Sequence, residues 1–350
     1  MSTKIAFRRK LFSEKTLTGK YCLSPFVSAR ITVKGDVFLC GCFEWQPTPI
    51  GNLFSSSIDT ILSSESAVKI RQSIIDGSYK FCDESKCSII RNNLLNTVDT
   101  LPADVHQQIQ DSAKYILPRE ISIAGDQTCN LSCPSCRTEI FKITDEFKEQ
   151  QMELGKLLKN NLFATPTNQT VNIQLSTSGE LFASTMLLAF VSSISAKDFP
   201  NVNLIVQTNG LLCKQNWHKL KDMQDRVKQI TVTVDAAEPA TYEKLRRGGK
   251  WENILNSLAW LSQKKKQNGM KFHTRMVVQK DNIDQLENFY HLSKQFDVDF
   301  VEYGRISDWN TYSNNAFADI DVLDPMHPEF QHANQCLKNI MTLKDVLTYG

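Results

Sequence analysis

Three cysteines stand close together near the middle of the chain, with the spacing Cys-x-x-x-Cys-x-x-Cys: Cys129, Cys133 and Cys136. Three thiolates on one short loop can ligate three irons of a cubane iron–sulfur cluster and leave the fourth iron without a protein ligand. An open coordination position is typical of a catalytic metal site, whereas a structural site is closed by protein ligands. The spacing therefore predicts a catalytic cluster, and a zinc loop is the alternative.

Most of the other cysteines lie near the N-terminus. Eight of the ten precede residue 137, and five of these lie in the first 90 residues: Cys22, Cys40, Cys42, Cys82 and Cys87. Because the cytoplasm keeps thiols reduced, such clustering indicates metal binding rather than a disulfide framework.

Strand-like runs alternate with helical patterns from residue 121 onward. We predict strands at 121–126, 171–176, 203–207, 229–235, 271–278 and 300–304, with helices that include 181–196, 214–226, 251–267 and 283–295. This alternation is typical of an α/β fold with a parallel sheet. Six such units form a partial barrel or an open doubly wound sheet, and in both the ligands bind at the carboxyl ends of the strands.

Chemically useful residues lie at the ends of the first four of these strands. The three clustered cysteines come directly after the first strand. Ser178-Gly179-Glu180 and Thr208-Asn209-Gly210 follow the second and third strands, and Thr233-Val234-Asp235 ends the fourth. Each polar segment alone is a common turn or helix start. Because they occur in order at successive strand ends, they predict one shared site.

Taken together, these segments resemble the radical SAM superfamily of S-adenosylmethionine (SAM) enzymes. The resemblance implies an α/β fold, a partial (β/α)6 TIM-like barrel of the radical SAM type. It implies a [4Fe–4S] cluster on Cys129, Cys133 and Cys136, with the amino and carboxylate groups of SAM on the fourth iron.

The same resemblance implies the contacts to SAM. Ser178-Gly179-Glu180 corresponds to the motif that receives the SAM ammonium group, where a carboxylate forms a charge-assisted hydrogen bond. Thr208 and Asn209 correspond to residues that bond the ribose hydroxyls, and Thr233 to a residue near the SAM carboxylate. Ser135 stands where the superfamily usually has an aromatic residue near the adenine.

The N-terminal cysteines resemble the SPASM/twitch module, which binds an auxiliary iron–sulfur cluster. The shared features are Cys22-Leu23-Ser24-Pro25-Phe26, a hairpin at 28–40 that turns at Lys34-Gly35-Asp36, the turn Ile50-Gly51-Asn52-Leu53 and two late cysteines. Usually this module follows the barrel, and here it comes first.

Four thiolates fully ligate one cluster, so we predict an auxiliary [4Fe–4S] cluster on Cys22, Cys40, Cys82 and Cys87. Cys42 is the substitute, because it lies two residues from Cys40 and shares its side of an extended strand. Structural zinc on the same residues is the alternative, since four thiolates suit zinc equally well.

The sequence predicts four regions along the chain. They are a SPASM/twitch-like module at 1–94, a linker helix at 95–118, the radical SAM partial barrel at 119–308 and a C-terminal tail at 309–350 that is placed to cover the active site. Within the first region, 57–75 has a helical pattern.

Composition excludes several classes of partner. The 350 residues include 40 basic and 38 acidic side chains. The resulting net charge of +2 is too small to create the positive potential that attracts nucleic acid. No apolar run approaches the roughly 20 residues of a membrane span, and the N-terminus lacks the features of a signal peptide. We expect a cytoplasmic protein that binds neither nucleic acid nor membrane.

The resemblance implies a radical SAM enzyme, an oxidoreductase or an enzyme that modifies peptides or sugars. It would cleave SAM reductively to a 5′-deoxyadenosyl radical and abstract hydrogen from a substrate carbon, with flavodoxin or ferredoxin as electron donor. Cys213 and Cys336 are candidate hydrogen donors to a substrate radical.

Three functions remain open from the sequence. By analogy with other SPASM-type enzymes, the first is modification of a ribosomal peptide or protein side chain. The second is oxidation, epimerisation or dehydration of a sugar or sugar nucleotide. The third is a non-enzymatic zinc- or cluster-binding scaffold or redox sensor, which gives no reason for the polar segments at the strand ends.

Overall fold

The computed structural model describes residues 17–41, 46–84, 86–110, 118–165, 168–175 and 179–349. The chain divides into two compact units, Met1–Ser122 and Ile123–Gly350.

The first unit contains the predicted hairpin. Strand β1 (Ser28–Thr32) pairs antiparallel with β2 (Asp36–Phe38), and Gly35 takes the positive φ of +78° that the turn between them requires. Strand β3 (Gly51–Asn52) pairs antiparallel with β2. The side-chain amide of Asn52 donates to the carbonyl oxygen of Lys34 and to Oδ1 of Asp36, both at 2.8 Å. The turn Ile50-Gly51-Asn52-Leu53 therefore stabilises the hairpin turn through the side chain of Asn52.

Short helices complete this unit: α1 (Ser24–Val27), α2 (Ile58–Leu62), α3 (Glu65–Ile75), α4 (Ser88–Arg91), the 3-10 helix η2 (Val98–Thr100) and α5 (Ala103–Gln110). The helical pattern at 57–75 divides into α2 and α3. The break has a local cause, because the Ser64 hydroxyl accepts a hydrogen bond from the backbone N–H of Ala67 and so begins a new helix.

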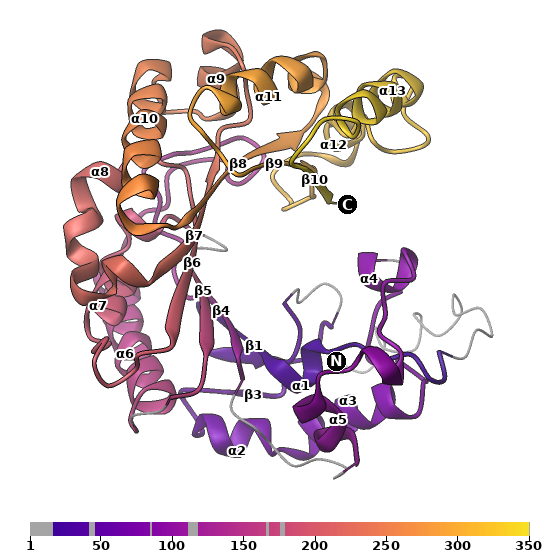
Figure 1. Ribbon diagram of the computed structural model, residues 1–350, viewed down its shortest axis with the longest axis vertical. Helices are drawn as coiled ribbons and strands as arrows, with labels where there is room; N and C mark the ends of the chain where they lie inside the picture. Colours follow the sequence, from indigo (N-terminus) through magenta and orange to yellow (C-terminus); the bar gives the residue numbers. More distant parts are fainter. Residues whose placement is uncertain are drawn as a thin grey trace. The chain divides into compact units, whose positions relative to one another are not determined.

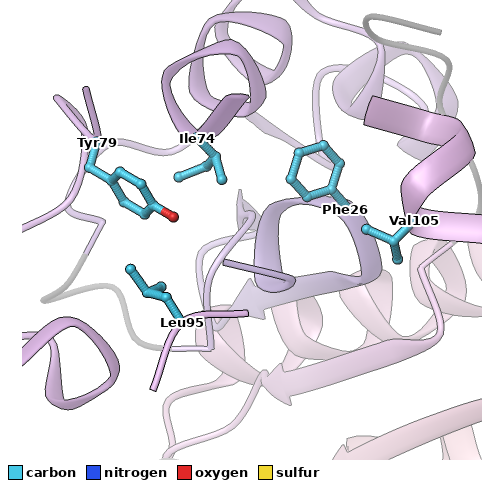
Figure 2. Close-up of a cluster of buried hydrophobic side chains, with 5 residues drawn as sticks. All are labelled: Phe26, Ile74, Tyr79, Leu95 and Val105. Atoms are coloured by element: carbon cyan, nitrogen blue, oxygen red, sulfur yellow. The ribbon is translucent and has the colours of Figure 1, made fainter. Parts of the chain in front are cut away.

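A small apolar core holds the first unit together. Figure 2 shows its buried side chains gathered around one interior: Phe26, Ile74, Tyr79, Leu95 and Val105. The hydroxyl of Tyr79 donates to the carbonyl oxygen of Lys20 at 2.8 Å, so this aromatic side chain is buried with its polar atom paired. Cys22 and Cys82 pack against the same core, which places two predicted metal ligands on a rigid base.

The second unit contains the predicted parallel sheet. Its strands are β4 (Glu120–Ala124), β5 (Val171–Leu175), β6 (Val202–Thr208), β7 (Val227–Thr233), β8 (Lys271–Val278), β9 (Phe300–Arg305) and β10 (Val346–Tyr349). They follow one another in sequence order across the sheet, and β5 to β10 pair in parallel. The predicted α/β fold is confirmed, and the boundary between the two units falls within β4.

Helices connect these strands: α6 (Asp145–Leu162), η3 (Leu181–Ala183), α7 (Thr185–Ser192), α8 (Cys213–Asn216), η4 (Trp217–Arg226), α9 (Pro239–Leu245), α10 (Trp251–Asn268), η5 (Lys280–Gln285), α11 (Leu286–Lys294), α12 (Asn314–Ile320) and α13 (Phe330–Ile340). In Figure 1, α6, α7, α8 and α10 lie along the outer face of the sheet. They cover an apolar layer, and along β6 the residues alternate between buried and half-buried as a sheet with two unlike faces requires.

The residues after Trp309, which the sequence pattern left unassigned, form α12, α13 and a further strand. Strand β10 pairs in parallel with β9, with Val346 opposite Val301 and Tyr349 opposite Gly304. The sheet therefore extends beyond the six predicted strands. A strand of four residues carries too little alternation to be recognised from its sequence.

Among the helices of the described residues, none combines the length and the apolar composition that crossing a membrane requires.

Candidate active site

The three clustered cysteines line one cavity of about 430 Å³ at the carboxyl ends of the strands in the second unit. Their loop is tightly turned, because the backbone N–H groups of Cys136 and Arg137 both donate to the carbonyl oxygen of Cys133, at 2.9 and 3.0 Å. The backbone N–H of Leu131 approaches Sγ of Cys129 at 3.4 Å. The loop thus directs three thiols toward one space.

Asp126 anchors the start of this loop. Its Oδ1 accepts hydrogen bonds from the backbone N–H and the hydroxyl of Thr128, at 2.7 and 2.6 Å, and its Oδ2 accepts one from the hydroxyl of Ser184. Ser184 also caps helix α7, since its hydroxyl accepts from the backbone N–H of Leu187. The buried Asp126 therefore connects the cysteine loop to a helix of the outer layer.

Glu180 is buried at the edge of the same cavity and connects two strand ends. Its Oε1 accepts from the hydroxyl of Thr208 at 2.7 Å and from the backbone N–H of Phe182 at 3.1 Å, and its Oε2 accepts from the backbone N–H of Asn209 at 2.7 Å. Burial raises the pKa of Glu180, and these hydrogen bonds oppose the rise. Three of the roughly four acceptor positions of a carboxylate are used, so one remains for a ligand cation.

Asn209 lies between Glu180 and the cysteine loop. Its side-chain amide donates to Oδ1 of Asn130 at 2.9 Å and lies 3.7 Å from Sγ of Cys129. The hydroxyl of Thr208 donates to Glu180 and accepts from the backbone N–H of Gly210 at 3.0 Å. The only hydroxyl proton of Thr208 is donated to Glu180. The side-chain amide of Asn209 is therefore the better hydrogen-bond donor toward the cavity.

Gly179 and Thr233 line the cavity as well, whereas Ser178 lies outside the described residues. A Cβ at Gly179 would lie 2.5 Å from the carbonyl oxygen of Asp126 and 2.8 Å from that of Thr128. No side chain fits there, so glycine is required for the close approach of this segment to the cysteine loop.

Arg246 is a cavity residue that the sequence analysis missed. A run of two basic residues such as Arg246-Arg247 is typical of a solvated helical face, but the side chain of Arg246 is only 12% exposed. The Nη1 atom of Arg246 lies 3.5 Å from Sγ of Cys133 and 3.5 Å from Oδ2 of Asp235, and its Nη2 donates to the carbonyl oxygen of Thr233. Burial lowers the pKa of Arg246, but Cys133 and Asp235 more than reverse this.

Arg247 also holds the cysteine loop. Its Nε donates to the hydroxyl of Ser132 at 3.0 Å, and its Nη2 donates to the carbonyl oxygen of Thr138 at 2.7 Å. The signal in the sequence was the pair of glycines that follows. A Cβ at Gly249 would lie 2.8 Å from the hydroxyl oxygen of Tyr242, so this glycine is required for close packing against α9, although Arg247 itself is exposed.

Two further arginines line the cavity, and each is paired with a carboxylate. Arg275 on β8 pairs with Glu302 on β9, with Nη2 at 2.6 Å from Oε2, and its guanidinium lies 5.4 Å from the ring centre of Tyr349 on β10. Arg305 at the end of β9 binds Asp321, with its Nη2 at 2.6 Å from Oδ2. Arg275, Arg305 and Tyr349 line the cavity, so two guanidinium groups held by carboxylates form part of its wall.

Four of the five N-terminal cysteines lie close together in the first unit. Burial raises the pKa of Cys82, and the neighbouring thiols of Cys22, Cys40 and Cys87 raise it further. Thiols that disfavour one another's ionisation in this way are well placed to share a metal, which stabilises the thiolate form. Cys42 lies outside the described residues.

Neither candidate hydrogen donor lines the cavity. Cys213 is fully buried, with its Sγ 3.6 Å from the hydroxyl of Thr208, and burial raises its pKa well above the usual value. Cys336 lies on α13 beside His332. Within the described residues, neither thiol therefore lies in the wall of this cavity.

Two family models match the two units of the chain. Residues 127–293 match the radical SAM superfamily, and residues 22–88 match SPASM, an iron–sulfur cluster-binding domain. The chain is a radical SAM protein with a SPASM domain. Its cofactors are SAM with a [4Fe–4S] cluster in the barrel and an auxiliary iron–sulfur cluster in the N-terminal domain. The unusual order, with the SPASM domain first, is the one that the cysteine positions predicted.

Two curated relatives of this radical SAM protein are named GTP 3',8-cyclase. The relative from Alkaliphilus metalliredigens is 26% identical over 197 residues, which are 54% of this chain and 57% of the relative. The relative from Lactiplantibacillus plantarum is 29% identical over 181 residues, which are 50% of this chain and 51% of the relative. The chain thus spans little more than half the length of these relatives.

Solved structures that resemble this chain are more distant in sequence. Streptococcus suis SuiB bound to S-adenosylmethionine is 14% identical, with 75% of this chain and 58% of SuiB covered and a TM-score of 0.44. Native anSMEcpe with bound AdoMet is 15% identical, with 66% of this chain and 63% of that chain covered and a TM-score of 0.43.

The residues of the cavity fit the cofactors of the superfamily. Three thiols of one loop supply the donor set that a cubane cluster with one open iron requires. The Nε atom of Arg246 is buried and lacks a hydrogen-bond partner within the described residues, which a carboxylate such as that of SAM would provide.

Proposed function

We propose that Cys129, Cys133 and Cys136 hold the [4Fe–4S] cluster that binds SAM, and that this chain is an enzyme that starts its reaction by taking hydrogen from a substrate carbon. The observation that carries the proposal is the shared cavity, in which the three thiols face polar residues from the ends of β5, β6 and β7. A scaffold or redox sensor needs the thiols but gives no reason for that polar wall.

Bound together, the cluster and SAM supply a one-electron cleavage that yields a carbon-centred radical able to take hydrogen from an unactivated carbon. The side chains of the protein bind and position SAM. Glu180 holds the ends of β5 and β6 in register and offers one oxygen to the SAM ammonium group. Asn209 fixes the loop of Cys129 and presents its amide to SAM, while Arg246 offers its unpaired Nε to a carboxylate.

For the N-terminal domain, we propose Cys22, Cys40, Cys82 and Cys87 as the ligands of the auxiliary cluster. The mutual effect of these thiols on the pKa of Cys82 supports the set. Flavodoxin or ferredoxin is the proposed electron donor, since each supplies one electron at a time.

For the substrate, we propose a peptide or a protein side chain, because enzymes with SPASM-type domains commonly act on such targets. A sugar or sugar nucleotide is the second candidate, and the guanidinium groups of Arg275 and Arg305 in the cavity favour it, since guanidinium groups bind phosphate and carboxylate well. Genes beside this one provide a simple check. A short precursor peptide supports the first candidate, and sugar-processing enzymes support the second.

The proposed function is tested by anaerobic incubation of the reconstituted protein with SAM and dithionite. Formation of 5′-deoxyadenosine and methionine is expected, since the open iron and the polar wall provide for SAM cleavage. A protein with both clusters assembled that forms neither product would show that the chain is a scaffold or sensor.

Arg246 should set the reduction potential of the cluster. A guanidinium near Cys133 favours the reduced and more negative cluster, so Arg246→Gln is expected to make the potential more negative by tens of millivolts, on the order of 1 kcal/mol. EPR-monitored redox titration measures this shift. Arg246→Lys keeps the charge and serves as the control. An unchanged potential in Arg246→Gln would mean that the guanidinium does not face the cluster.

A further inference from the structure

Three potential metal ligands meet on the surface of the second unit. Asp284 in η5 and His332 and Cys336 in α13 bring their ligand atoms within 4.8 Å of one another. The Nε2 atom of His332 lies 2.6 Å from Oδ1 of Asp284 and 3.7 Å from Sγ of Cys336. None of the three lines the catalytic cavity.

The contacts of His332 distinguish a metal site from a proton relay. In a Cys-His-Asp relay, the thiol and the carboxylate contact opposite nitrogens of the imidazole ring. Here both contact the same nitrogen, Nε2. The three donor atoms therefore converge on one point, which is the arrangement that a bound cation requires.

The distances also agree with a tetrahedral ion after a small adjustment. Zinc bonds of about 2.3 Å to sulfur and about 2.0 Å to nitrogen place a cysteine and a histidine ligand roughly 3.6 Å apart, close to the 3.7 Å between Cys336 and His332. The oxygen of Asp284 must move away from His332 by about 0.7 Å to reach a ligand separation of roughly 3.3 Å. Because the side chains of Asp284 and His332 are 76% and 55% exposed, this movement is open to them.

We propose that Asp284, His332 and Cys336 bind a zinc ion, with water as the fourth ligand. One thiolate, one imidazole and one carboxylate form a mixed donor set that suits zinc better than the oxygen-binding cations calcium and magnesium. His332 and Cys336 are four residues apart on α13 and so lie on the same face of a helix. This site is separate from both iron–sulfur clusters and does not rest on the proposed reaction.

The ion would fasten the C-terminal segment to the barrel. Helix α13 leads into β10, and β10 carries Tyr349 to the wall of the catalytic cavity. A zinc bridge between α13 and η5 fixes the element from which β10 begins. The site thus gives the chain a second kind of metal, which holds a cavity wall in place.

The test uses protein with both clusters already assembled, incubated with zinc chloride, desalted and measured for zinc. We expect about one retained zinc per chain in the wild type. His332→Ala and Cys336→Ala should weaken zinc binding by more than about 100-fold, because even the loss of an outer-shell partner costs up to that much. His291→Ala is the matched control, since His291 is an exposed helical histidine beside a carboxylate, Glu287.

X-ray absorption at the zinc edge identifies the site. One sulfur with nitrogen and oxygen neighbours is expected, whereas four sulfurs would place the zinc among the N-terminal cysteines. The proposal is overturned if the wild type retains no zinc, if His332→Ala retains as much as the wild type, or if the edge reports four sulfurs.

Discussion

Replacing Cys133 with alanine is expected to lower 5′-deoxyadenosine formation by at least about a thousandfold, or roughly 4 kcal/mol of barrier. The thiol lies in the cavity beside Arg246, and a cubane cluster that loses one of three thiolates has no fixed open iron. The backbone of the loop should be preserved, because it is the carbonyl oxygen of Cys133 that accepts the hydrogen bonds of Cys136 and Arg137. Liquid chromatography of anaerobic reactions measures the product.

Cys213→Ala is the matched control for this variant. Cys213 is a second buried cysteine of the same unit, and it does not line the cavity. The Cys213→Ala variant should therefore still cleave SAM. If Cys133→Ala formed as much 5′-deoxyadenosine as Cys213→Ala, the cluster would have to be held elsewhere.

Glu180→Ala is the second change with a large expected effect. It removes the acceptor of three buried hydrogen bonds, from Thr208, Phe182 and Asn209. Leaving such donors without a partner should lower the free energy of unfolding by about 3 kcal/mol. For a unit of this size, the thermal midpoint should fall by about 6 to 12 °C. Calorimetry of the reconstituted protein measures the shift.

Glu180→Gln separates the structural role of this side chain from its contact with SAM. The amide oxygen can still accept from Thr208 and Phe182, so the loss of stability should be smaller than in the alanine variant. An ammonium group facing a neutral amide loses a charge-assisted hydrogen bond, and SAM affinity should fall by about tenfold. Normal SAM affinity in Glu180→Gln would show that the carboxylate does not contact SAM. Its role would then be limited to connecting the ends of β5 and β6.

The strands of the barrel could be predicted from the sequence because each is a compact apolar run followed by a helical pattern. The hairpin of the first unit was equally clear, since Gly35 marks its turn. Strand β10 (Val346–Tyr349) was missed because four residues after a helix carry no periodic signal. Its place in the sheet is set by pairing with β9, a contact between residues 45 positions apart in the sequence, such as Val346 and Val301.

The cysteines of the site were predictable because thiolates with fixed spacing have few other uses. The cationic residues of the cavity were not. Arg246, Arg275 and Arg305 look like ordinary charged residues until the fold buries or pairs them, and their role depends on partners such as Asp235 and Glu302. Local sequence indicates which groups can do chemistry, whereas the pairing of distant charges is decided by tertiary structure.

The most direct test of the account is the iron and sulfide content of anaerobically reconstituted protein, compared with a variant in which Cys129, Cys133 and Cys136 are all alanine. About eight irons per chain are expected in the wild type and about four in the variant, because two separate thiolate sets each hold a cubane. About four irons in the wild type and none in the variant would mean that the N-terminal cysteines do not hold an iron–sulfur cluster and bind another metal. An iron content that does not change in the variant would contradict the assignment of the catalytic cluster.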